Sequence, residues 1–157
     1  MKLEDKDLSA RIAAHPFLAG LTPHHIELLA ASASIAQFAA GQEIFRAGDE
    51  AGGFYLIESG QANLEGAIAD KPHVQIDIVS AGEPLGWSWL FPPYLWHYDA
   101  RAAKPTSAIF FDRATFREFC DNDLTLGHEL YKRMSKVMVR RLQASRTKMI
   151  DMLHKSD

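Results

Sequence analysis

Glycines divide the middle of the chain into short segments, and this feature restricts the possible folds more than any other. Between Ile35 and Phe111 the sequence consists of brief apolar or alternating runs. These runs are separated by Gly41, Gly48, Gly52, Gly53, Gly60, Gly66, Gly82 and Gly86. Many short strands joined by turns are typical of this pattern. We therefore expect a barrel, roll or sandwich of strands over residues 35–111.

Three segments within this region have clear strand character. The apolar run Phe54–Ile57 ends at the turn pair Ser59-Gly60. Residues 74–78 alternate apolar and polar side chains, which is the period of a strand with one buried face. Ala108–Phe111 forms the last apolar run before Asp112, which can cap a following helix.

Helices are expected on both sides of the strands, over residues 8–34 and 112–155. Thr22 followed by Pro23 is a typical helix start. A long helix without proline is predicted from Leu126 to His154. Side chains recur along it at alternating steps of three and four, at Tyr131, Ser135, Met138, Leu142, Ser145, Met149 and Met152. This heptad spacing favours a homodimer, and packing on the same domain is the alternative.

Length and composition limit the function classes. With 157 residues the chain suits one domain, and no apolar run reaches the roughly 18 residues of a membrane helix. The net charge of -3 argues against a nucleic-acid binder. A lone cysteine, Cys120, excludes an internal disulfide and fits a cytoplasmic protein. The mixed charges of Met1–Lys6 do not match a secretory signal.

Several stretches together carry a family resemblance. They are the turn His15–Leu21, the glycine-flanked runs Gly41–Asp49 and Phe54–Gly60, and Arg140–Gln143 on the long helix. The chain resembles the sensor domain of the catabolite-activator and fumarate-nitrate regulator (Crp/Fnr) superfamily, a cyclic nucleotide-binding domain. The resemblance implies a mainly β fold with flanking helices: a β-roll, or double-stranded β-helix jelly roll, with a long C-terminal dimerisation helix. One such domain would fill residues 1–157 and leave no room for a DNA-binding domain.

The resemblance also implies a loop that holds a cyclic phosphate and ribose through one glutamate and one arginine. The corresponding loop begins at Gly82, and Gly86 and Arg101 fit the family pattern. However, Trp87 stands at the glutamate position, and Leu95 or Trp96 stands at the arginine position. A buried phosphate without a counter-charge is costly, so cyclic AMP in its usual pose is disfavoured and the cofactor is left unknown. Ser145 matches the family's hydroxyl residue on the dimer helix, and Arg101 is a possible substitute cation.

The loop contains an unusual density of aromatic residues, including Trp87, Trp89 and Trp96. One interpretation is that these indoles fill the pocket themselves. Another is a flat or apolar ligand, with Ser88 and His97 as its polar partners. A haem site using His97 is the third. No metal site is predicted, because no second ligand stands at a diagnostic spacing.

We find no nucleophile–base pair, phosphate loop or zinc motif at a working spacing, so we do not expect an enzyme. The leading hypothesis is a dimeric sensor or regulatory domain in signal transduction with a degenerate ligand loop. The alternatives are a sensor for another small ligand and a ligand-free interaction module. In the last case the basic flank of the long helix, over residues 132–155, would dock an acidic protein partner.

Overall fold

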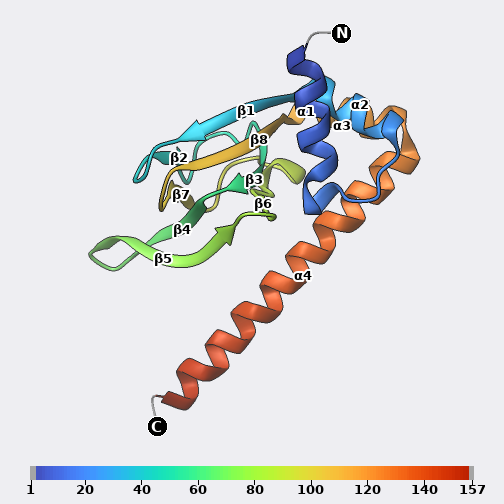
Figure 1. Cartoon of the computed structure of the whole chain (residues 1–157). Coiled ribbons are helices and arrows are strands. Elements are labelled where there is room, and N and C mark those ends of the chain that lie inside the picture. The colour runs from blue at the N-terminus through green and yellow to red at the C-terminus, as the bar shows by residue number, and fades with distance from the viewer. Residues whose placement is uncertain (1–2, 156–157) are drawn as a thin grey trace.

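The structure is a computed structural model that describes residues 3–155, with side chains described from Asp7 onward (Figure 1). Met1 and Lys2 lie outside the described residues. They are part of Met1–Lys6, the segment that does not match a secretory signal. Helices α1 (Leu3–Ala14), η1 (Pro16–Leu18, a 3-10 turn) and α2 (Pro23–Ser32) come first, and helices α3 (Arg113–Asn122) and α4 (Leu124–Lys155) come last.

Between the helices, the strands form two four-stranded antiparallel sheets. One sheet has the order β1 (Ala33–Phe38), β8 (Thr106–Asp112), β3 (Gly53–Ser59) and β6 (Pro84–Leu85). The other has the order β2 (Glu43–Phe45), β7 (Asp99–Ala102), β4 (Gln61–Ile68) and β5 (Lys71–Ser80). The predicted fold class, a β-roll with flanking helices, is confirmed.

The predicted helix caps are also confirmed. The Thr22 hydroxyl accepts a hydrogen bond from the His25 amide at 3.2 Å at the start of α2. The Asp112 carboxylate accepts one from the Thr115 amide at 3.0 Å at the start of α3. Each cap satisfies a backbone donor that the helix itself cannot pair.

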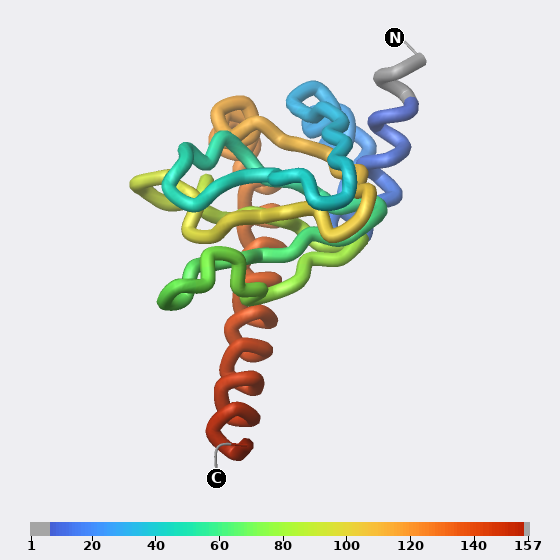
Figure 2. Tube along the Cα trace, turned by 90° about the vertical axis from the view of Figure 1, so that its left-hand side faces the viewer, coloured from blue at the N-terminus to red at the C-terminus, as the bar shows by residue number. Residues whose placement is uncertain are grey.

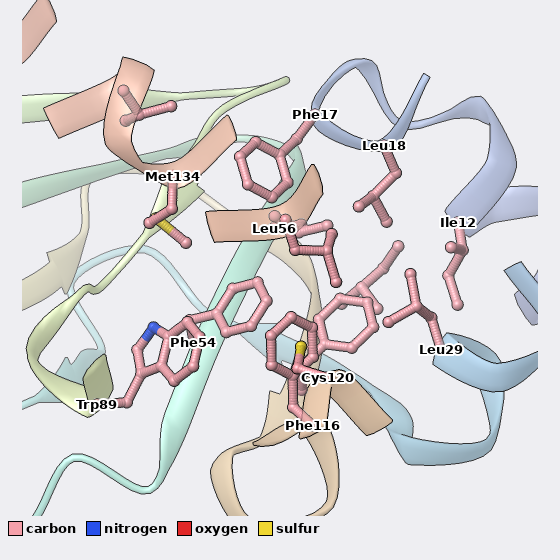
Figure 3. Close-up of a cluster of buried hydrophobic side chains, with 14 of the residues drawn as sticks. Ile12, Phe17, Leu18, Leu29, Phe54, Leu56, Trp89, Phe116, Cys120 and Met134 are labelled. Atoms are coloured by element: carbon pink, nitrogen blue, oxygen red, sulfur yellow. The ribbon is translucent and has the colours of Figure 1, made fainter. Parts of the chain in front are cut away.

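The main core joins the terminal helices to one sheet. Figure 3 shows Ile12, Leu18 and Leu29 from the first helices meeting Phe116, Cys120 and Met134 from the last two around Phe54. Fully burying a large apolar side chain contributes about 1.5–3 kcal/mol, so this cluster fixes the helices to the roll. Cys120 belongs to this core, and burial raises the pKa of its thiol to about 11.

One buried polar group connects the first helices to the roll. His15 lies against β3, with its Nε2 at 2.9 Å from the Ile57 carbonyl oxygen, while its Nδ1 accepts the Phe17 amide at 3.2 Å. Because Nδ1 accepts, Nε2 carries the proton and donates to Ile57. Burial lowers the pKa of His15, which keeps the ring neutral.

Helix α4 has two differently packed halves (Figures 1 and 2). Its first half runs along the domain and buries Leu126, Gly127, Leu130, Met134 and Val137. Its second half starts beside strands β4 and β5 and then extends beyond the β-roll. The seam residues Leu142, Met149 and Met152 of this half are 58%, 61% and 70% exposed. The two earlier seam residues differ, since Tyr131 is only 37% exposed and Met138 packs partly against the core.

The heptad positions are therefore displaced by one residue from the stripe that α4 buries on its own domain. None of the described helices combines the length and apolar character needed to cross a lipid bilayer.

Candidate functional site

A cleft of about 400 Å³ lies between the β4–β5 sheet and the middle of α4. The roll supplies one wall through strands β4 and β5 and the loop residues Trp87 and Tyr98, and α4 supplies the other. We call it the α4 cleft, and its lining residues are Leu64, Ile76, Asp77, Trp87, Tyr98, Met138, Val139, Arg141, Leu142 and Ser145. Most of these side chains are apolar or aromatic, so the cleft suits a largely apolar ligand.

Four residues predicted from the sequence line this cleft: Trp87 and Ser145 of the predicted ligand site, and Met138 and Leu142 of the predicted dimer seam. Trp87 lines it from the loop and Ser145 lines it from α4, although 58 positions separate them in the chain. The Trp87 indole also stacks on the His97 ring, with 5.2 Å between centroids and 19° between planes. This contact holds the indole at the edge of the cleft.

The other two tryptophans of the loop lie in the protein interior. Trp96 is 7% exposed and stacks on Phe45, with 3.8 Å between ring centroids. Trp89 is 1% exposed, stacks on Phe54 and donates its indole N–H to the Gly86 carbonyl at 3.2 Å. Neither indole lines the α4 cleft.

Gly86 is required by this packing. Its φ of 99° lies in the left-handed region, and a Cβ built on it would come within 2.8 Å of the Trp96 ring. A side chain at this position would therefore strain the backbone and displace the indole. Trp96 occupies the space that the absence of a Cβ leaves open.

The remaining predicted site residues lie outside the cleft. Ser88 and His97 pair with each other, with 3.1 Å between the serine Oγ and the histidine Nδ1. Leu95 forms an isolated antiparallel β-bridge with Glu50 through the backbone, and its side chain is 39% exposed. Arg101 donates to Glu65 at 3.0 Å and to the Gly41 carbonyl at 3.1 Å, so its guanidinium is engaged in the β4–β7 region.

Two charged residues of the cleft, Arg141 and Asp77, were not predicted as site residues from the sequence. Arg141 is half-buried and donates a hydrogen bond to the Pro84 carbonyl oxygen at 2.7 Å. Burial lowers the pKa of Arg141, although the nearby charges of Asp77 and Glu83 oppose this shift. Arg141 lies three residues after Met138 and four before Ser145, so its position on the same helix face was a signal that could have found it.

Arg141 also lines a second, more polar cavity of about 400 Å³. Asp77 lines both cavities as well, and it pairs with Lys148 of α4 at 3.9 Å. The two side chains thus stand where the cavities adjoin. Among residues 3–155, no cluster of three or more histidine, cysteine, aspartate or glutamate side chains is placed to hold a metal ion.

Comparisons with known proteins agree with this architecture. The family model described as a cyclic nucleotide-binding domain matches residues 35–123. A curated relative, Acetyltransferase Pat of Mycolicibacterium smegmatis, is 39% identical over 70 residues, which cover 45% of this chain. The chain spans only 21% of the length of that relative.

Two solved structures have the same fold over most of the chain. A cAMP-binding acyltransferase from Mycobacterium smegmatis has a TM-score of 0.73 at 27% identity, covering 89% of this chain and 42% of the other. The sensor domain of the transcriptional regulator DNR from Pseudomonas aeruginosa has a TM-score of 0.72 at 16% identity, covering 90% of this chain and 95% of the other. The second match confirms the fold that the Crp/Fnr resemblance implies.

Proposed function

The chain belongs to the cyclic nucleotide-binding domain family, and from this we propose that it is a non-catalytic sensor domain whose α4 cleft binds a small molecule without the usual ribose and phosphate anchors. The observation that carries the proposal is the position of two indoles. Trp87 lines the cleft where the resemblance implies a ribose-binding carboxylate. Trp96 is buried against Phe45 at one of the two candidate positions for the phosphate-binding cation.

Energetics support a ligand other than cyclic AMP in its standard pose. A phosphate that loses water without gaining a counter-charge costs several kcal/mol. Arg101, the substitute cation considered above, is held by Glu65 and Gly41. An indole at the ribose position supplies a donor and an aromatic face instead of an acceptor, which favours a flat apolar ligand.

A regulatory role is supported by the way α4 forms part of the cleft. Met138, Arg141, Leu142 and Ser145 all lie on this helix within about two turns. A ligand with different affinity for two positions of α4 would shift the population between them. The shift in the position of α4 would then also move the exposed second half of the helix.

A non-catalytic role is supported by the polar groups of the cleft. Among the described residues, the Ser145 hydroxyl has no side-chain hydrogen-bond partner that could serve as its base. The one serine–histidine pair in the loop, Ser88 and His97, lies outside the cleft. We place the domain in the cytoplasm, in keeping with its single, buried cysteine.

A thermal-shift panel with cyclic AMP, cyclic GMP, cyclic dinucleotides and haem tests the proposal. We expect little shift with cyclic AMP and a clear rise in Tm with a cleft ligand. Ser145→Leu fills the cleft and should abolish the rise, whereas Ser135→Leu, an exposed position on the same helix, should keep it. A large cyclic AMP shift that disappears in Arg101→Ala would contradict the proposal.

We also infer that the second half of α4 pairs with α4 of a second copy. Support comes from the exposed side chains of Leu142, Met149 and Met152 at heptad spacing. Sedimentation should show a dimer that Met149→Glu dissociates and Gln143→Glu preserves. A monomeric parent protein would refute the pairing and favour the interaction with an acidic protein partner.

A further inference from the structure

Arg141 is the cation of the α4 cleft. Its guanidinium has five N–H donors in a planar fork, and the Pro84 carbonyl oxygen accepts the only hydrogen bond that this side chain donates among the described residues. No carboxylate of those residues lies within 4.0 Å of the Arg141 guanidinium, which is the distance limit for an ion pair. Donors therefore stay available on the side of the guanidinium that borders the cleft.

The acidic groups near Arg141 have other partners. Asp77 pairs with Lys148 at 3.9 Å, and the Glu83 carboxylate accepts the Ser80 amide at 3.0 Å. The neighbouring Arg140 lines the adjoining cavity but not the α4 cleft. Arg141 is thus a half-buried positive charge that lies near the charges of Asp77 and Glu83 but forms no ion pair with either carboxylate.

The rest of the cleft favours a planar apolar body. Leu64 and Ile76 supply aliphatic surface from β4 and β5, and Trp87 and Tyr98 supply aromatic surface from the loop. Aromatic rings of a ligand stack favourably on such faces. A volume of about 400 Å³ suits a molecule of one to three rings.

We propose that the α4 cleft binds a small molecule with a planar aromatic body and one anionic group, a carboxylate or a phosphate, which pairs with Arg141. This inference rests on the proposed function, because it assumes that the cleft is the ligand site. In the anchoring pattern implied by the resemblance, the cation belongs to the loop. Here the cation comes from α4, so the charge of the ligand is held by the helix that would carry the signal.

Calorimetric titration of the whole chain with three probes tests the inference. Naphthoate and naphthyl phosphate carry the anion, and naphthamide has the same ring system without charge. We expect at least one anionic probe to bind about tenfold more tightly than the amide, since a charge-assisted hydrogen bond adds 1.5 to 3 kcal/mol at about 1.4 kcal/mol per tenfold. The stronger of the two anions identifies the class of charged group.

Variants assign the effect to the residue. Arg141→Met should bind the anionic probes no better than the amide, and Arg141→Lys should keep part of the preference because it keeps the charge. Arg140→Met is the matched control and should retain the parent's preference. Thermal melts of all three variants verify that each remains folded at the titration temperature.

Three results would overturn the inference: equal binding of the anionic and neutral probes, an unchanged preference in Arg141→Met, or no binding of any probe. The variant Ser145→Leu distinguishes a wrong role of Arg141 from a wrong assignment of the α4 cleft as the ligand site. If the anionic and neutral probes bind equally and Ser145→Leu abolishes both, the cleft is still a ligand site and only the role of Arg141 is wrong. If Ser145→Leu leaves binding unchanged, both proposals fail.

Discussion

Trp87 and Trp89 are two positions apart in the chain, yet they belong to different parts of the molecule. Trp89 packs among Phe54 and Phe116 in the main core, whereas Trp87 lines the α4 cleft and is partly accessible to solvent. Trp96 resembles Trp89, since it is buried against Phe45. The tryptophans of this one loop therefore have two different roles. Their positions in the folded structure, and not their spacing in the sequence, distinguish the indole that can contact a ligand from the two that fill the interior.

The strongest test of this difference is the loss of each indole. Trp89→Ala should lower the free energy of unfolding by about 3–5 kcal/mol, because it leaves a cavity in a packed core. Trp87→Ala should change it by about 1 kcal/mol or less. Urea denaturation followed by circular dichroism measures both variants. Equal losses in the two variants would remove the distinction between core and cleft.

A smaller effect is expected at the glycine beneath Trp96. Gly86→Ala should destabilise the protein by about 1–3 kcal/mol, because the new Cβ meets the indole and the positive φ disfavours a side chain. Gly52→Ala is the matched control, since a Cβ there meets nothing within 4 Å and its φ is not positive. A Gly86→Ala protein as stable as the control would show that Trp96 is not tightly held.

Acid should weaken the core through His15. Burial lowers the pKa of His15 in the folded protein, whereas the unfolded chain takes up a proton near the ordinary pKa of 6.5. The stability that depends on the neutral ring is therefore complete above about pH 6.5 and is lost as the pH falls below it. Urea midpoints at several pH values should show this slope in the parent protein. His15→Gln keeps a donor for Ile57 but cannot titrate, so an equally steep slope in this variant would exclude His15 as the cause.

The smallest effect concerns solvent access. Acrylamide should quench a fraction of the tryptophan fluorescence in the parent protein, and that fraction should disappear in Trp87→Phe without a significant loss of stability. Trp89 and Trp96 are buried and should stay protected. Quenching that persists in Trp87→Phe would mean that the loop opens and exposes the inner indoles.

The fold was largely predictable from local patterns. Glycine spacing marked the strands, and Thr22 and Asp112 marked the helix starts. The exact face of α4 was harder to predict, because its side chains repeat at steps of four and three along more than one stripe of the helix. The buried residues Leu130, Met134 and Val137 follow the same steps as the predicted seam but lie one position before it.

The site was only partly predictable, because its walls come from distant segments. Trp87 and Ser145 were found through the family resemblance and both line the cleft. Leu64 and Ile76 were not predicted as site residues, and Ile76 was interpreted only as part of the alternating run 74–78, because a lining position on a strand looks like any other apolar strand position. Arg141 was hidden within a run interpreted as part of the dimer helix. Its role in the cleft depends on packing against Pro84, which is 57 positions away.

Helix α4 continues without a break from the buried Leu126 to Lys155, and this continuity makes it a lever. Its 14 residues after Arg141 extend about 21 Å at 1.5 Å per residue. A tilt of about 10° at the cleft would therefore displace the C-terminal end of α4 by about 3–4 Å over that length. A small side-chain change at the cleft can leave the β-roll undisturbed. At the C-terminal end of α4 the same change would produce a displacement large enough to alter a contact with another molecule.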